Sequence, residues 1–149
     1  MKNQILEELA NRKSTRAFEE ADITHEERAS IITAAAMAPT AGCQQLYTIL
    51  DVTDADLKKR LADLCDHQPF IASAKLLLVF CADCKKWYDS FSSAGCNPRR
   101  PGAGDLLLAV NDALIAAQNA VTAAESFGIG SCYIGDVMEN CEQMRDALH

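Results

Sequence analysis

An alanine-rich stretch from Asp105 to Phe127 is the feature that most constrains the fold of this chain. Alanine favours helix, and Gly128 directly after the stretch can take the left-handed conformation in which many helices end. The stretch therefore predicts one long helix over residues 105–127. The side chains of Asn111, Asp112 and Glu125 would be costly in hydrocarbon, so we do not expect this helix to span a membrane.

Length and charge limit the classes of protein to consider. A chain of 149 residues is long enough for one domain with a buried core. Its 14 basic and 21 acidic residues give a net charge of −7, which excludes nucleic-acid binding through a diffuse basic surface. An anionic ligand would therefore need a local cluster of cations. The N-terminus lacks the apolar core of a signal peptide, so we expect a cytoplasmic protein with no membrane partner.

Outside the alanine-rich stretch, predicted helices alternate with a few short strands. Thr24 to Glu27 has the form of a capping box, and the helix that it begins must end before Pro39. We expect helices over residues 2–10, 24–38, 53–64, 83–91 and 137–148, strands over 46–52, 75–81 and 131–134, and a loop over 92–104. This arrangement predicts an α+β sandwich.

The first candidate for chemistry is a basic cluster made of Arg12, Lys13 and Arg16, with Ser14 and Thr15 between the cations. Guanidinium, ammonium and hydroxyl groups at this spacing can hold a phosphate through charge-assisted hydrogen bonds. For such a cluster taken alone, a solvated basic turn that balances the acidic residues at 19, 20 and 22 is the commoner explanation.

Two further segments could border a ligand. Residues 38–45 follow a predicted helix, and small side chains there let backbone approach a ligand while Thr40, Gln44 and Gln45 offer hydrogen bonds. A plain turn between helix and strand is the simpler explanation. Residues 128–136 contain three glycines, but their spacing is not that of a dinucleotide loop and a helix precedes them, so we reject a Rossmann site.

Thiol, metal and hydrolase sites receive little support. The seven cysteines are odd in number and irregularly spaced, so we expect reduced thiols. Cys81 and Cys84 form a CxxC pair, but the sequence lacks a second pair at zinc-ribbon spacing and the nearest histidine is His67. His25 and the terminal His149 have no visible serine or cysteine partner, so a catalytic triad is not indicated and we predict no metal site.

Taken in order, these segments resemble the nitroreductase family over nearly the whole chain. The resemblance rests on RKSTR at 12–16, APTAGCQQLYTILDV at 38–52, HQPFIASAKLLLVFCAD at 67–83, GDLLLAVNDALIAAQNAVTAAESFGIG at 104–130 and SCYIGD at 131–136. It implies an α+β fold, a nitroreductase-like α/β/α sandwich, in a homodimer with flavin mononucleotide (FMN) at two interface sites. It also implies that small alanines of the long helix pack across the dimer (Ala109, Ala113, Ala116, Ala117 and Ala120).

The resemblance assigns roles to individual residues around the cofactor. It implies that four residues hold the phosphate and ribityl chain, namely Arg12, Lys13, Ser14 and Arg16. Pro39 and Thr40 of the partner subunit would border the flavin ring, beside Cys43, which stands where the family usually has asparagine. Gln68 would reach the polar edge of the ring. The backbone of three residues would lie near the ring nitrogen that accepts hydride (Tyr133, Ile134 and Gly135).

The implied activity follows from the cofactor, because flavin carries the hydride while protein supplies binding and orientation. The resemblance implies an oxidoreductase that passes hydride from NAD(P)H to nitroaromatic, quinone or related small aromatic acceptors, with no obligatory catalytic side chain. Family members are expected to continue beyond His149 through a strand and a C-terminal arm, so we expect a single, C-terminally short flavin-binding domain over residues 1–149. A non-catalytic or weakly flavin-binding dimeric remnant, and a thiol redox protein using Cys81 and Cys84, are the alternatives.

Overall fold

The computed structural model describes residues 3–148. The chain divides into two compact units, each built from segments that are distant in the sequence. The first unit comprises residues 1–28, 51–78 and 124–149, and the second comprises residues 29–50 and 79–123.

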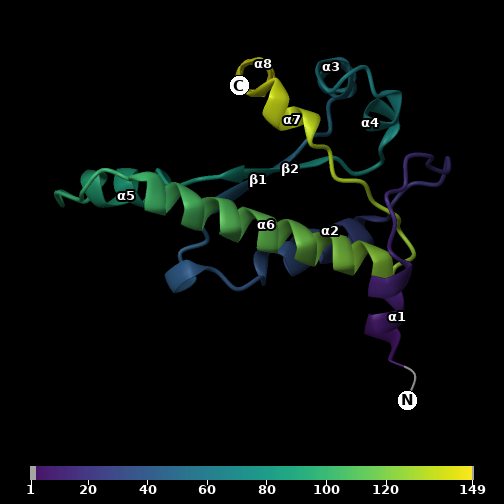
Figure 1. The fold of residues 1–149 in the computed structure, drawn as a ribbon, viewed down its shortest axis with the longest axis horizontal. Coiled ribbons are helices and arrows are strands. Elements are labelled where there is room, and N and C mark those ends of the chain that lie inside the picture. Colours follow the sequence, from purple (N-terminus) through teal and green to yellow (C-terminus); the bar gives the residue numbers. More distant parts are fainter. Residues whose placement is uncertain (1–2, 149) are drawn as a thin grey trace. The chain divides into compact units, whose positions relative to one another are not determined.

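The first unit is a group of short helices. Helix α1 (Gln4–Asn11) precedes the basic cluster, and α3 (Ala55–Leu64) packs against α4 (Pro69–Ser73) and α8 (Cys141–Ala147), as Figure 1 shows. Of the two residues at which this helix could begin, Thr53 and Asp54, it is the aspartate that caps α3, because Asp54 Oδ1 accepts the backbone N–H of Leu57 at 2.7 Å. The buried apolar side chains of these helices form the core (Leu61, Ala62, Cys65, Ile71, Met144 and Ala147).

The second unit contains most of two long helices, α2 (His25–Ala36) and α6 (Ala103–Ser126), of which residues 25–28 and 124–126 belong to the first unit. The predicted capping box is confirmed, because the Thr24 N–H bonds Glu27 Oε2 at 2.8 Å and the Glu27 N–H bonds Thr24 Oγ1 at 3.2 Å. Figure 1 shows α2 alongside α6, and Asn119 Nδ2 donates to the Ala34 carbonyl at 3.2 Å. The short helix α5 (Lys86–Ser93) also belongs to this unit.

The long helix predicted from the alanine-rich stretch is α6, and its end is the predicted one. Gly128 has a φ of 74°, and the N–H of Ile129 bonds the carbonyl of Ala124 at 2.9 Å. This is the hydrogen-bonding pattern of a Schellman motif, which requires a left-handed residue after the helix. Glycine takes that conformation without a steric penalty.

The packing of α6 corrects one expectation. The five alanines that were expected to face a second subunit are buried within the chain itself, with exposed fractions from 0 to 7% (Ala109, Ala113, Ala116, Ala117 and Ala120). Their spacing follows the helical repeat, so they form the inner face of the helix. Large apolar side chains of α6 are also exposed, most of them away from this inner face (Leu106, Leu107, Leu108, Val110, Leu114 and Ile115).

Among the described residues, α6 is the one helix whose length and composition would allow it to cross a membrane, with a mean hydropathy of 1.3. Two of its polar side chains nevertheless bond to neighbouring segments of the second unit. Asp112 is 2% exposed and accepts two backbone N–H groups, and Asn119 donates to a backbone carbonyl. Polar groups with such partners are typical of a core helix in a globular protein.

Two strands form the sheet, β1 (Tyr47–Asp51) and β2 (Leu78–Ala82). The N–H of Asp83 bonds the carbonyl of Leu46, and the N–H of Val52 bonds the carbonyl of Leu77, so the strands run antiparallel. The second strand was expected to begin at Lys75 but begins at Leu78.

Three other boundaries differ from the sequence-based prediction. The strand expected over 131–134 is a single bridge at Ser131, because only the short segment around Ser14 lies beside it. The helix expected over 137–148 is divided into α7 (Asp136–Glu139) and α8 at Asn140, whose side chain donates to the Leu64 carbonyl at 2.8 Å. Helix α4 was not predicted. The predictions for Lys2 and His149 concern residues outside the described range.

Candidate functional site

The first unit brings the basic cluster next to the glycine-containing segment 128–136. Ser14 and Ser131 form a parallel bridge, and the N–H of Thr15 bonds the carbonyl of Ser131 at 2.9 Å. A Cβ atom at Gly130 would lie only 2.5 Å from Thr15 Oγ1. The two segments can therefore approach this closely only because residue 130 is glycine.

The cations of this cluster are not neutralised by nearby acids. Within residues 3–148, the side chains of Arg12, Lys13 and Arg16 form no ion pair and no hydrogen bond, although the chain carries seven more acidic than basic groups. Arg16 instead lies over the ring of Phe70, with 6.0 Å between its guanidinium carbon and the ring centroid. The cluster thus retains its donors for an anionic ligand.

Tyr133 lies close enough to the cluster to feel its charge. Burial raises the pKa of the Tyr133 phenol, and the positive charge of Arg12 opposes that shift. The tyrosine is 46% exposed, so one part of the ring contacts protein and the other faces solvent. The segment that follows the bridge therefore leaves Tyr133 and Gly135 accessible, with Ile134 half-buried between them.

Gln68 completes the group of candidate residues in the first unit. Asp66 and His67 both have positive φ angles, of 56° and 53°, and this turn brings the N–H of Gln68 to the carbonyl of Ala62 at 3.0 Å. The side-chain Nε2 of Gln68 donates to the Cys65 carbonyl at 2.9 Å and to Asp136 Oδ2 at 2.6 Å. Gln68 is thereby tied to the segment that holds Tyr133 and Gly135.

The remaining predicted residues lie in the second unit, on the loop from Pro39 to Gln45. Pro39 and Cys43 are exposed and Thr40 is half-buried. Cys43 has a φ of 58°, which only glycine and, less readily, asparagine adopt at low cost. The Thr40 hydroxyl accepts the N–H of Gln45 at 3.2 Å, which stabilises the loop internally.

Side chains of α5 and α6 hold this loop in place. Asp112 of α6 accepts the N–H groups of Ala41 and Leu46. From α5, Lys86 Nζ donates to the Gln45 carbonyl at 2.7 Å, and the indole N–H of Trp87 donates to the Gln44 carbonyl at 2.8 Å. The strained conformation of the loop is thus maintained by bonds to both helices.

Comparison with known proteins decides the family. The sequence profile of the nitroreductase family matches residues 9–149. The chain belongs to the nitroreductase family. It is 35% identical over 144 residues to the oxygen-insensitive NADPH nitroreductase of Salmonella typhimurium, covering 96% of this chain and 58% of that protein. It is 30% identical to the FMN reductase (NADPH) of Bacillus subtilis, covering 98% of this chain and 59% of that protein.

Solved structures of this family have the same fold. The NfrA1 nitroreductase of B. subtilis matches with a TM-score of 0.93 at 30% identity, covering 97% of this chain and 60% of that chain. The NADPH:FMN oxidoreductase of Vibrio harveyi, solved in complex with NAD⁺, matches with a TM-score of 0.89 at 32% identity, covering 98% and 62%. The predicted α+β nitroreductase fold is therefore confirmed. The chain spans about three fifths of the length of these relatives.

Cys81, the first cysteine of the CxxC pair in this nitroreductase-family chain, is poorly suited to act as a nucleophile. Burial raises the pKa of the Cys81 thiol, and the negative charge of Asp83 raises it further. A thiol with a raised pKa is less ionised at neutral pH and is a weaker nucleophile. All seven cysteines are free thiols. Among residues 3–148, no group of three or more histidine, cysteine or acidic side chains could hold a metal ion.

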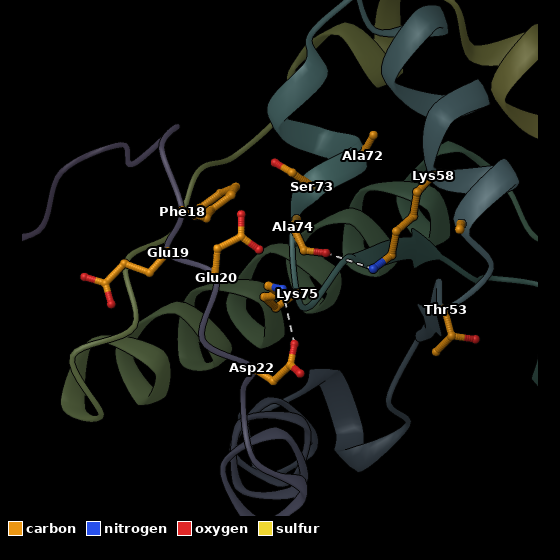
Figure 2. Close-up of a pocket in the computed structure, with 11 residues that line it drawn as sticks. Phe18, Glu19, Glu20, Asp22, Thr53, Lys58, Ala72, Ser73, Ala74 and Lys75 are labelled. Atoms are coloured by element: carbon orange, nitrogen blue, oxygen red, sulfur yellow. Dashed lines mark hydrogen bonds and ion pairs between the residues drawn. The ribbon is translucent and has the colours of Figure 1, made fainter.

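A pocket of about 460 Å³ in the first unit is lined by both acids and lysines (Figure 2). Lys75 pairs with Asp22 at 3.2 Å, and Lys58 donates to the Ala74 carbonyl at 2.8 Å, as the dashed lines show. Glu19 and Glu20 add further negative charge. Because both ammonium groups already have partners and the carboxylates outnumber them, we do not assign a phosphate group to this pocket.

The prediction missed three residues that organise the candidate segments, Phe70 and Asp136 in the first unit and Asp112 in the second. Asp136 closes the SCYIGD segment, directly after Gly135, and could have been included for that reason. Asp112 gave a signal too, since an acid in the middle of an apolar helical stretch indicates a buried partner. Phe70 gave none, because an aromatic residue near Pro69 is equally typical of a core.

Proposed function

We propose that this chain is an FMN-dependent oxidoreductase that passes hydride from NAD(P)H to nitroaromatic, quinone or related small aromatic acceptors, and that residues 1–149 act as one cytoplasmic flavin-binding domain. The names of its relatives support this proposal, since they include an FMN reductase and an NADPH nitroreductase. When bound, the flavin would supply the redox chemistry, while the protein binds and orients the cofactor. No side chain is assigned a catalytic role.

The residues of the first unit fit such a cofactor. Arg12, Lys13 and Arg16 keep their donors free for a phosphate, and Ser14 adds a hydroxyl. Ser131 Oγ is buried without a hydrogen-bond partner among the described residues, as expected of a group that completes its bonding with a ligand. We therefore assign the phosphate and ribityl chain to residues 12–16.

The flavin ring would lie against the other predicted residues. Tyr133, Ile134 and Gly135 would supply backbone near the ring nitrogen that takes part in hydride transfer, and Gln68 would contact the polar edge. The exposed loop with Pro39, Thr40 and Cys43 would border the ring from a second subunit. Its exposure and its fixed conformation both support that role.

We further propose that the protein is a homodimer. The outer face of α6 exposes Leu107 (65%) and Leu114 (58%), two turns apart on the same side of the helix, with Val110 between them. An exposed apolar stripe of this kind is unfavourable in water and is typical of an interface. We propose a second copy of this chain as the partner that covers this stripe, because it would also bring its own loop, Pro39 to Gln45, to the cofactor.

A single observation carries the proposed function: the segment 12–16, whose three cations have no acidic partner among the described residues, is bonded to the backbone of Ser131, and Arg12 lies near enough to Tyr133 to oppose the rise in its pKa. The test is an Arg12→Ala/Arg16→Ala double variant, with Arg60→Ala/Arg100→Ala as a control, since those two arginines are exposed and, like Arg12 and Arg16, form no ion pair in the described part of the chain. Each lost charged hydrogen bond should weaken FMN binding about 10- to 100-fold.

Absorbance spectra of the purified proteins provide the measurement. Wild type and the Arg60/Arg100 control should be yellow and carry FMN, whereas the Arg12/Arg16 variant should be colourless but folded. Equal flavin retention in both variants would contradict the assignment. A wild-type protein that binds FMN but oxidises no NADH or NADPH with a quinone acceptor would instead support the non-catalytic alternative.

A further inference from the structure

The side-chain amide of Gln68 has a fixed orientation. A glutamine amide carries two hydrogens on Nε2 and acceptor lone pairs on Oε1. Nε2 lies 2.9 Å from the Cys65 carbonyl and 2.6 Å from Asp136 Oδ2. A carbonyl and an ionised carboxylate only accept hydrogen bonds, so the nitrogen must face both of them. Both amide hydrogens are therefore used within the protein.

The backbone on either side makes this orientation hard to change. The left-handed residues Asp66 and His67 lead into Gln68, whose own N–H is bonded to Ala62, and Pro69 follows it. Asp136 lies at the first position of α7, in the segment that includes Gly135. Rotating the amide by half a turn would set Oε1 against two acceptors, which is unfavourable in a half-buried position.

This orientation limits the hydrogen bonds that Gln68 can form with a ligand. The group that Gln68 can still offer to a ligand is the carbonyl oxygen Oε1, which accepts and cannot donate. The polar edge of a flavin carries one donor, the N3–H group, between two carbonyl acceptors. A glutamine with a free amide nitrogen could bond either carbonyl, but Gln68 with its nitrogen engaged matches N3–H alone.

We infer that Asp136 is a positioning residue that holds Gln68 as a hydrogen-bond acceptor for the N3–H group of the flavin. This inference rests on the proposed function. It assigns Asp136 no contact with the cofactor. Asp136 acts through Gln68 and determines which edge group of the ring Gln68 recognises.

The test compares binding of FMN with binding of N3-methyl-FMN, which lacks the donor. Affinities are measured by titrating the apo-protein and following flavin fluorescence, so that turnover is not needed. Gln68→Leu reports the steric part of the preference, because leucine accepts no hydrogen bond. The preference is the Kd for N3-methyl-FMN divided by the Kd for FMN. This ratio should be about tenfold larger in wild type than in Gln68→Leu, the effect expected of one hydrogen bond.

Variants of Asp136 then test the positioning role. Asp136→Leu should lose most of the additional preference, because the freed amide can turn and donate to a flavin carbonyl. Asp136→Asn should retain it, because an asparagine oxygen can still accept from Nε2. Asp136→Ala, which removes the same acceptor without adding bulk, should also lose most of the additional preference. That variant keeps the test valid if Asp136→Leu does not fold.

The outcomes separate the two proposals. A wild-type protein that binds neither flavin would overturn the proposed function and, with it, this inference. Binding of FMN with the same preference in wild type, Gln68→Leu and Asp136→Leu would leave the proposed function intact and overturn the role of Asp136. Loss of preference in Asp136→Asn, with thermal stability unchanged, would also count against it.

Discussion

Asp112 of α6 accepts the backbone N–H of Leu46 at 3.1 Å, and the two residues are 66 positions apart in the sequence. The same carboxylate accepts the N–H of Ala41 at 2.9 Å. One buried acid thus holds the loop in place on both sides of Cys43. The bonds lie within the second unit and link its core helix to a segment predicted to border the cofactor.

Replacing Asp112 with alanine should strongly destabilise the protein. The change would leave two backbone N–H groups without an acceptor, and each buried unsatisfied group costs about 1–3 kcal/mol. We expect the free energy of unfolding to fall by about 2–5 kcal/mol, measured by urea denaturation. Asp56→Ala serves as the control, because the Asp56 side chain is 92% exposed, and it should change stability by less than about 0.5 kcal/mol. Similar losses in both variants would contradict the role of Asp112.

Replacing Cys43 with asparagine should stabilise the fold. Cys43 has a φ of 58°, a conformation that costs a residue with a Cβ atom about 1–2 kcal/mol, and asparagine tolerates it best among such residues. We expect a gain of about 0.5–1 kcal/mol in the free energy of unfolding. Cys96→Asn, which changes another exposed cysteine whose φ is not positive, should give no gain. A loss of stability in Cys43→Asn would show that the thiol makes a contribution that outweighs the strain.

Replacing Gly130 with alanine should separate the basic cluster from the Ser131 segment. The new Cβ atom would meet Thr15 Oγ1 at 2.5 Å, and overpacking of this kind costs about 1–3 kcal/mol. We expect reduced thermal stability together with weaker FMN binding. Gly104→Ala is the matched control, since a Cβ there meets nothing within 4 Å. Normal flavin binding in a folded Gly130→Ala protein would argue that the bridge does not form the site.

Stability should fall in acid partly through Asp83. Burial raises the pKa of its carboxyl, but hydrogen bonds from the Lys86 N–H, the Thr48 hydroxyl and the Lys85 N–H outweigh burial and leave that pKa lowered. A lowered folded-state pKa stabilises the protein above the unfolded value of about 4, and this contribution is lost as pH falls through the folded value.

The corresponding measurement is the free energy of unfolding of wild type and Asp83→Asn between pH 7 and pH 3. Asp83→Asn should be less stable at neutral pH, and the difference should shrink below about pH 4. Thr48→Val, which removes one of the three hydrogen bonds, should shift the acid transition of the protein toward higher pH. A stability difference between wild type and Asp83→Asn that does not depend on pH would exclude this carboxylate as the source.

The proposed dimer should depend on the outer face of α6. A Leu107→Asp/Leu114→Asp variant would place two charges in the apolar stripe, where burial against a second copy is unfavourable. We expect wild type to elute as a dimer in size-exclusion chromatography with light scattering, and the variant as a monomer. Met37→Asp, which alters another exposed apolar residue (78%), should remain dimeric. A dimeric double variant would place the interface elsewhere.

Much of the local structure could be predicted because its signals are close together in the sequence. The capping box of Thr24 and Glu27, the Asp54 cap and the Gly128 end of α6 each depend on bonds between residues at most five positions apart. The succession of RKSTR, the Pro39 loop and SCYIGD was also enough to indicate the nitroreductase family, which the profile match over residues 9–149 confirms.

The tertiary structure decided what those elements meet. The single bridge at Ser131 in place of a strand, the division of the last helix at Asn140 and the inward face of the α6 alanines all depend on neighbours that are distant in the chain. The orientation of Gln68 likewise depends on Asp136, 68 positions away. Local propensity is determined by adjacent residues, whereas a strand partner, a buried face or an amide orientation is determined by whichever group folding brings within bonding distance.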